Sequence, residues 1–132
     1  MTISIIQLCL PYPPLSGNNA NKVGQGRIYK TDAAKGFELA VKSVIVNSRF
    51  ASIKVDYQII VTYDVWPPDK RERDSDNVEK PTKDAITKAG LWSTDSNKLI
   101  RESRFRWHDR NEEEAPHGLV VLTIKTFDKP SQ

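Results

Sequence analysis

The sequence has little that would suit an oxidising compartment or a membrane. It contains a single cysteine, Cys9, in 132 residues, so no disulfide can form within the chain. No apolar run approaches the roughly 20 residues that cross a bilayer. The first residues, Met1 to Ile6, carry no charged leader and no Ala-x-Ala-like cleavage site, so we expect no signal peptide. These absences predict a cytoplasmic protein with no membrane partner.

Charge is only slightly unbalanced, but it is unevenly distributed. The formal net charge is +3 and the sequence pI is near 9.0. Lys70, Arg71 and Arg73 form one basic cluster, and a second follows Asp95 (Lys98, Arg101, Arg104, Arg106 and Arg110). Such patches are typical of nucleic-acid binding, although either cluster alone is better explained as a solvated surface.

Hydrophobic periodicity predicts one domain, residues 1–132, of the α+β class. Two helices would lie on a small mixed β-sheet in the order β-α-β-α-β-β. The first strand is apolar enough for Cys9 to be buried in it. The expected elements are a strand (3–10), a long loop (11–30), a helix capped by Thr31 (to 45), a strand (55–65), a helix from Asn77 or Pro81 to Gly90, a strand (103–107), a charged turn (109–118) and a strand (119–126).

Carboxylates gather around the second predicted helix. Asp74 and Asp76 stand one residue apart, directly after the first basic cluster, and Asp95 follows the helix. Close carboxylates repel each other unless a cation lies between them, and Mg²⁺ prefers oxygen ligands. Basic residues beside such a site suggest a polyanionic substrate. The stretch therefore predicts a metal-dependent enzyme acting on phosphodiesters, although Asp95 can meet the pair only if the chain doubles back.

Other Asp-x-Asp sites fit the sequence less well. An EF-hand loop needs glycine at its sixth position, which here is Glu79. In haloacid-dehalogenase-type phosphatases the first aspartate follows a buried strand directly, whereas residues 70–73 intervene here. Glycosyltransferases with this motif need a far larger nucleotide-sugar domain.

Three motifs span most of the chain. The central one is Asp74-x-Asp76-Asn77-x-x-Lys80-Pro81-x-x-Asp84-Ala85-Ile86, followed by Gly90-Leu91-Trp92 and Asp95. It is preceded by Trp66-Pro67-Pro68-Asp69-Lys70-Arg71-Glu72-Arg73, and nearer the start the chain reads Leu10-Pro11-Tyr12-Pro13-Pro14 with Asn18-Asn19. Together these motifs resemble the RusA-type Holliday-junction resolvases, a family often carried by prophages.

The resemblance implies a homodimeric endodeoxyribonuclease that binds four-way junction DNA in recombination and repair and resolves it by paired symmetric nicks. It implies Mg²⁺ (or Mn²⁺ in its place) and no nucleotide cofactor. Two alternatives stay open: a structure-selective nuclease on forks or flaps, and a non-catalytic junction-binding protein.

The resemblance also assigns roles to individual residues. Asp74, Asp76 and Asp95 would be the catalytic and metal-site carboxylates, and Lys80 a catalytic or phosphate-contacting lysine rather than a helix-surface partner of Asp84. Members of the family often have two acidic residues where this chain has Thr94 and Asp95. DNA contacts are expected from Lys70, Arg71 and Arg73 and, in the long loop, from Arg27 and Lys30.

Overall fold

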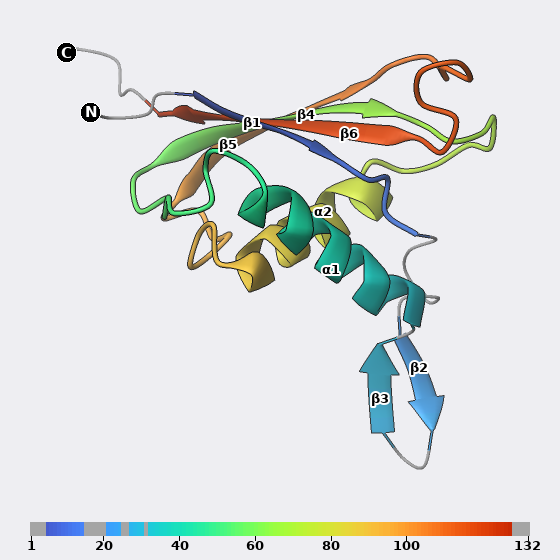
Figure 1. The fold of residues 1–132 in the computed structure, drawn as a ribbon, viewed down its shortest axis with the longest axis horizontal. Coiled ribbons are helices and arrows are strands. Elements are labelled where there is room, and N and C mark those ends of the chain that lie inside the picture. Colours follow the sequence, from blue (N-terminus) through green and yellow to red (C-terminus); the bar gives the residue numbers. More distant parts are fainter. Residues whose placement is uncertain (1–4, 15–20, 25–26, 31, 128–132) are drawn as a thin grey trace.

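The computed structural model describes residues 5–14, 21–24, 27–30 and 32–127. A four-stranded sheet carries two helices on one face, and a two-stranded hairpin stands apart from it (Figure 1). The elements are, in chain order, β1 (Ile5–Leu10), β2 (Asn21–Gly24), β3 (Arg27–Lys30), α1 (Asp32–Val46), β4 (Ile59–Trp66), α2 (Asp76–Ala89), β5 (Ile100–Trp107) and β6 (Leu119–Thr126).

The sheet is mixed, as predicted. Its strand order is β1-β6-β4-β5, in which β6 pairs antiparallel with both β1 and β4, and β4 pairs parallel with β5. Parallel neighbours need a crossover connection, and α2 supplies it. The unit β4-α2-β5 therefore fixes where each end of α2 lies relative to the strands.

The core lies between the sheet and the two helices. Alternate residues of β4 are fully buried (Ile59, Val61, Tyr63 and Val65). On α1 the residues Phe37, Val41 and Ile45 are buried, which confirms the predicted helical face. Each such side chain contributes about 1.5–3 kcal/mol when it leaves water.

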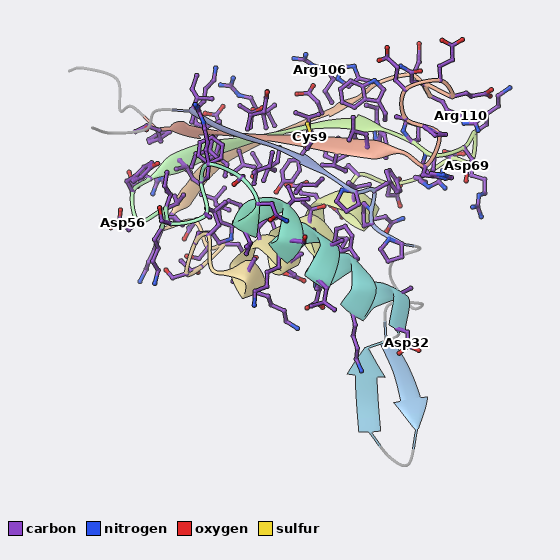
Figure 2. The ribbon with its side chains drawn as sticks, in the orientation of Figure 1. Cys9, Asp32, Asp56, Asp69, Arg106 and Arg110 are labelled. Atoms are coloured by element: carbon purple, nitrogen blue, oxygen red, sulfur yellow. The ribbon has the colours of Figure 1, made fainter. Side chains whose placement is uncertain are left out.

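Strand β1 is buried on one face only, and the prediction that Cys9 is buried was wrong. Ile6, Leu8 and Leu10 point into the core, whereas Ile5, Gln7 and Cys9 are exposed. Successive side chains of a strand point to opposite faces, and the helices cover only one face of this sheet (Figure 1). Figure 2 shows Cys9 at the sheet, away from the helices.

Several element boundaries differ from the sequence prediction. The expected loop over residues 11–30 contains the hairpin formed by β2 and β3, and Thr31 lies outside the described residues. Strand β4 begins at Ile59, while Val55 makes only an isolated bridge to Trp92. Strand β5 begins at Ile100, three residues before the predicted start, because it pairs with β4 along its whole length.

Helix α2 begins at Asp76, so of the two predicted starts the one near Asn77 holds and Pro81 lies inside the helix. The missing N–H of Pro81 deprives the Asn77 carbonyl of its helical hydrogen bond. Gly90 ends the helix with a φ of 86°, and its N–H donates to the carbonyls of Ile86 and Thr87. Neither α1 nor α2 has the length and apolarity needed to cross a bilayer, within the residues described.

A substitution at Gly118 tests how tightly the turn before β6 packs against Tyr12. Gly118 has a φ of 81°, and a Cβ built on it would lie 2.8 Å from Cβ of Tyr12. We expect Gly118→Ala to lower the free energy of unfolding by about 1–3 kcal/mol, measured by urea unfolding, because it combines backbone strain with a clash. Gly36→Ala is the control: nothing lies within 4 Å of its added Cβ, and it should instead stabilise α1 by about 0.5–1 kcal/mol. Equal effects of the two substitutions would contradict the packing described for Gly118.

Candidate active site

The acidic pair stands at the start of α2. Asp74 ends the connection from β4 and Asp76 is the first residue of the helix; both side chains are exposed. Backbone hydrogen bonds fix the turn between them: Asn77 N–H donates to the Asp74 carbonyl at 3.1 Å, and Glu79 N–H donates to the Ser75 carbonyl at 2.9 Å. A carboxylate in the first turn also interacts favourably with the helix dipole. Both carboxylates are thus held outside the core at one end of α2.

Asp95 lies in the connection that leaves the other end of α2. Because β4 and β5 are parallel, the helix between them runs back against the strands, and residues 90–99 join its last turn to the start of β5 (Figure 1). A helix of 14 residues is about 21 Å long. The chain does double back after α2, but it brings Asp95 to the opposite end of the helix from Asp74 and Asp76.

In the part of the chain that the structure describes, one copy does not bring these three carboxylates together as a metal centre. Within the described residues, no three Asp, Glu, His or Cys side chains come together as a group that could hold a metal ion. The donor chemistry itself suits a hard divalent cation, because Asp74, Asp76 and Asp95 offer exposed carboxylate oxygens. None of the three side chains forms a hydrogen bond or an ion pair with another described residue, so none is needed to hold the fold. Their assignment as metal ligands stays a prediction.

A buried phenol on β4 feels the negative charges of both Glu79 and Asp95. Tyr63 is fully buried on β4, and its hydroxyl has no hydrogen-bond partner among the described residues. Burial raises its pKa strongly, and the negative charges of Glu79 and then Asp95 raise it further. Glu79 was not among the predicted site residues, although its spacing of three from Asp76 places both on one side of α2. Glu79 is therefore a further carboxylate close to the acidic pair, and its side chain is less exposed than those of Asp74, Asp76 and Asp95.

Lys80 is exposed on α2 and is not paired with Asp84. Within the described residues, the ion pair at this spacing is formed instead by Lys83 and Glu79, at 3.7 Å. The simple alternative for Lys80, a surface partner of Asp84, is thus not formed. Its amine is accessible beside the acidic pair.

The basic residues before the acidic pair differ in exposure: Arg73 is largely buried, whereas Lys70 and Arg71 are exposed. Arg73 is only 11% exposed and donates to both carboxylate oxygens of Asp69, at 2.6 and 2.9 Å. Arg71 also pairs with Asp69, at 3.0 Å, but remains 67% exposed, and Lys70 is exposed. Figure 2 shows Asp69 at the turn that follows β4. Lys70 and Arg71 are accessible to a polyanion, whereas the geometry of Arg73 fits a role in holding this connection in place.

The two remaining predicted DNA contacts lie on the hairpin. Arg27 and Lys30 begin and end β3, which pairs with β2 through Gly24 and Asn21. The hairpin projects away from the sheet and the helices (Figure 1), and the side chains of Arg27 and Lys30 lie outside what the structure describes. Their role stays a prediction.

Most of the second basic cluster lies on the edge strand β5 and in the turn after it, and Lys98 lies just before the strand. Arg104 pairs with Glu102 at 3.0 Å, and Arg106 lies 3.8 Å from Asp64 while remaining 71% exposed. Arg110 donates to the Pro68 carbonyl at 3.1 Å. Neighbouring carboxylates partly neutralise Arg104 and Arg106, so this cluster is a weaker polyanion surface than its sequence suggests.

Comparison with known proteins shows which family shares these motifs. The family model described as endodeoxyribonuclease RusA matches residues 11–117. The chain is 32% identical over 89 residues to the crossover junction endodeoxyribonuclease RusA of Escherichia coli (strain K12), covering 67% of this chain and 72% of that protein. Proteins of the same name from Shigella sonnei and from Enterobacteria phage 82 match with the same identity and coverage. The aligned proteins thus include one encoded by a phage.

The Asp69 carboxylate gives a prediction about this connection. Hydrogen bonds from Arg73, and secondly from Arg71, hold its pKa far below the ordinary value. A lowered pKa means that the ionised pair favours folding at neutral pH, and that this contribution is lost only as the pH falls through the lowered pKa. We expect carboxyl-detected NMR titration to show Asp69 ionised well below pH 3.9. Arg73→Ala should raise its pKa more than Arg71→Ala does. The reverse order would mean that Arg71 is the main partner in solution.

Proposed function

The chain belongs to the RusA family of endodeoxyribonucleases, and from this premise we propose that it resolves Holliday junctions by nicking two opposed strands of four-way DNA. The observation that carries the proposal is the acidic pair at the start of α2, exposed and unpaired within the described residues, directly after a basic connection. Because these two carboxylates make no hydrogen bond or ion pair with other described residues, they are available to bind a cation or a substrate. The enzyme would be a single domain, residues 1–132, acting on DNA in the cytoplasm, and its phage relative fits a prophage origin.

The site would be completed by a second copy of the chain. Asp74 and Asp76 lie at one end of α2 and Asp95 lies past the other end, about a helix length away. If all three serve one site, Asp95 has to come from another subunit. A two-fold homodimer would form two such sites, and two sites suit symmetric nicking of a two-fold junction. We therefore propose that Asp95 of the partner subunit faces Asp74 and Asp76 in each site.

The proposed roles follow from charge and exposure. Asp74, Asp76 and the partner's Asp95 would hold Mg²⁺, with Mn²⁺ as a substitute, and no nucleotide cofactor would take part. The bound cation supplies positive charge for the phosphate oxygens and acidifies water. Lys80, beside the pair, would stabilise negative charge developing on the phosphate. Lys70 and Arg71, with Arg27 and Lys30 of the hairpin, would hold the DNA backbone.

A nicking assay tests the reaction and its acidic site. A labelled synthetic four-way junction should receive paired symmetric nicks in Mg²⁺ and none in EDTA. Asp76→Asn should lower the nicking rate by about 100-fold or more, as losing one charge-stabilising group at a reaction centre does. The same variant should still shift the junction in a gel, and Asp84→Asn on the same helix is the control that keeps its activity.

The outcomes separate the alternatives. Nicking of forks or flaps in preference to junctions would identify a structure-selective nuclease of another specificity. Junction binding without nicking in any divalent ion would identify a binding protein. Equal affinity for the junction and for linear duplex of equal length would count against resolution. Binding in every DNA-based case should weaken steeply as salt rises, because phosphate contacts release counterions.

Subunit mixing tests the shared site. Asp76→Asn and Asp95→Asn should each be inactive as pure dimers. If the site is shared, a heterodimer of the two variants has one site in which both lesions meet and one site with every carboxylate intact. Mixing two inactive proteins, with exchange of subunits, should therefore restore nicking of one strand per junction. A mixture that stays inactive, although mass spectrometry shows the heterodimer, would place all three carboxylates in one chain.

A further inference from the structure

A hollow opens beside the acidic pair, between three segments that are distant in the sequence. Its volume is about 470 Å³, within the range of about 300–1,000 Å³ typical of sites for small organic groups. It is lined by Tyr12 and Pro13 of the turn after β1, by Arg71 and Arg73 of the basic connection with Asn77 of α2, and by His117 of the turn before β6. Since Arg73 and Asn77 flank Asp74 and Asp76 in the sequence, the hollow adjoins the proposed site of nicking.

The walls of this hollow are fixed by interactions within the chain. The two hydrogen bonds from Arg73 to Asp69 hold the basic connection, and the Arg73 guanidinium lies 5.6 Å from the centre of the Tyr12 ring. Gly118, next to His117, approaches Tyr12 so closely that no side chain fits between them. The hollow is therefore preorganised, and its shape does not depend on a bound ligand.

The charge of the lining favours an uncharged ligand. Its formally charged residues are two cations, Arg71 and Arg73, and two anions, Asp69 and Glu72, so the formal charges cancel. A phosphate would call for an excess of positive charge. Three prolines (Pro13, Pro14 and Pro68) add flat apolar surface. An uncharged planar group with polar edges fits this lining, and DNA supplies such a group in its bases.

Asn77 carries the groups that can read such an edge. Its amide side chain is exposed and makes no hydrogen bond with another described residue. An asparagine amide offers one donor face and one acceptor face side by side, which matches the edge of a base. Arg71 also lines the hollow, and its guanidinium is exposed, so a phosphate next to the bound group could reach it.

We infer that the hollow receives one base of the strand to be cut, turned out of the stack beside the phosphate that is cleaved, and that Asn77 reads its edge. Turning out a base is easiest where it is not paired, as at the branch point of a junction. The hollow would thereby couple the choice of substrate to the sequence at the cut. This inference rests on the proposed function.

Fluorescence tests whether a base enters the hollow. Synthetic junctions carry 2-aminopurine, an adenine analogue that brightens when it leaves the stack, at one position at a time around the cut. The unaltered protein is added in EDTA, so that binding occurs without nicking. One position should respond, and the response should be lost in Asn77→Ala and weakened in His117→Ala. Asn47→Ala, an exposed asparagine at the far end of α1, is the matched control and should respond as the unaltered protein does.

Nicking rates test whether the hollow reads the base. Junctions differing only at the responding position should be cut at different rates by the unaltered protein. Asn77→Ala should reduce that preference by about 5-fold or more, the lower bound for one good base contact. Circular dichroism and thermal unfolding show whether Asn77→Ala folds. If it does not, His117→Ala is the test variant in its place, because it leaves the acidic motif intact. Mg²⁺ dependence should be the same in the unaltered protein and in Asn47→Ala.

The two proposals fail in different ways. If the unaltered protein binds and nicks the junction but no position responds, the inference is overturned and the proposed function stands. If the base preference is unchanged in both Asn77→Ala and His117→Ala, the inference is likewise overturned and the proposed function stands. If the unaltered protein neither binds nor nicks the junction, the proposed function fails and the inference falls with it.

Discussion

The parallel pairing of β4 with β5 is the constraint on which the rest of the structure depends. Two parallel neighbours cannot be joined by a tight turn, so α2 has to carry the chain from one end of the strands back to the other. The connection before the helix and the connection after it are therefore separated by the length of α2. Every candidate carboxylate sits on one of these two connections or in the first turn between them. The crossover thus decides that a single chain presents an acidic pair at one end and a lone aspartate at the other.

A second set of contacts ties together three segments that the sheet alone would leave independent. Asp69 accepts hydrogen bonds from Arg73 and Arg71, Arg73 packs over Tyr12, and Gly118 packs against the same tyrosine. These contacts link the basic connection, the turn after β1 and the turn before β6. Residues 109–118 have no evident role in the sequence, but in the structure His117 of this turn lines the hollow. The first turn of α2 is consequently held next to a preformed cavity rather than on a loose surface loop.

Much of the fold follows from local patterns along the chain. Alternation in β4, the apolar stripe of α1 and the glycine that ends α2 are short-range signals, and each element appears where its signal lies. The predictions that were wrong concern which face of a strand the helices cover. Cys9 belongs to an apolar strand, yet it faces outward because the helices pack on the other side of the sheet. Likewise, strands β2 and β3 lack the alternation that marks a buried strand, since they stand apart from the core.

The sequence by itself determined which chemical groups the candidate site offers. Asp74, Asp76 and Lys80 lie within one short motif next to basic residues. Residues this close along a helix and the segment before it stay close in space in any fold. Only the tertiary structure decided how these groups relate to distant ones. The distance from Asp95 to the pair depends on strand order and direction, and the bracing of Arg73 by Asp69 depends on how the connection turns. The buried hydroxyl of Tyr63 and the hollow beside Asn77 arise where segments meet in space, and no local pattern encodes such meetings.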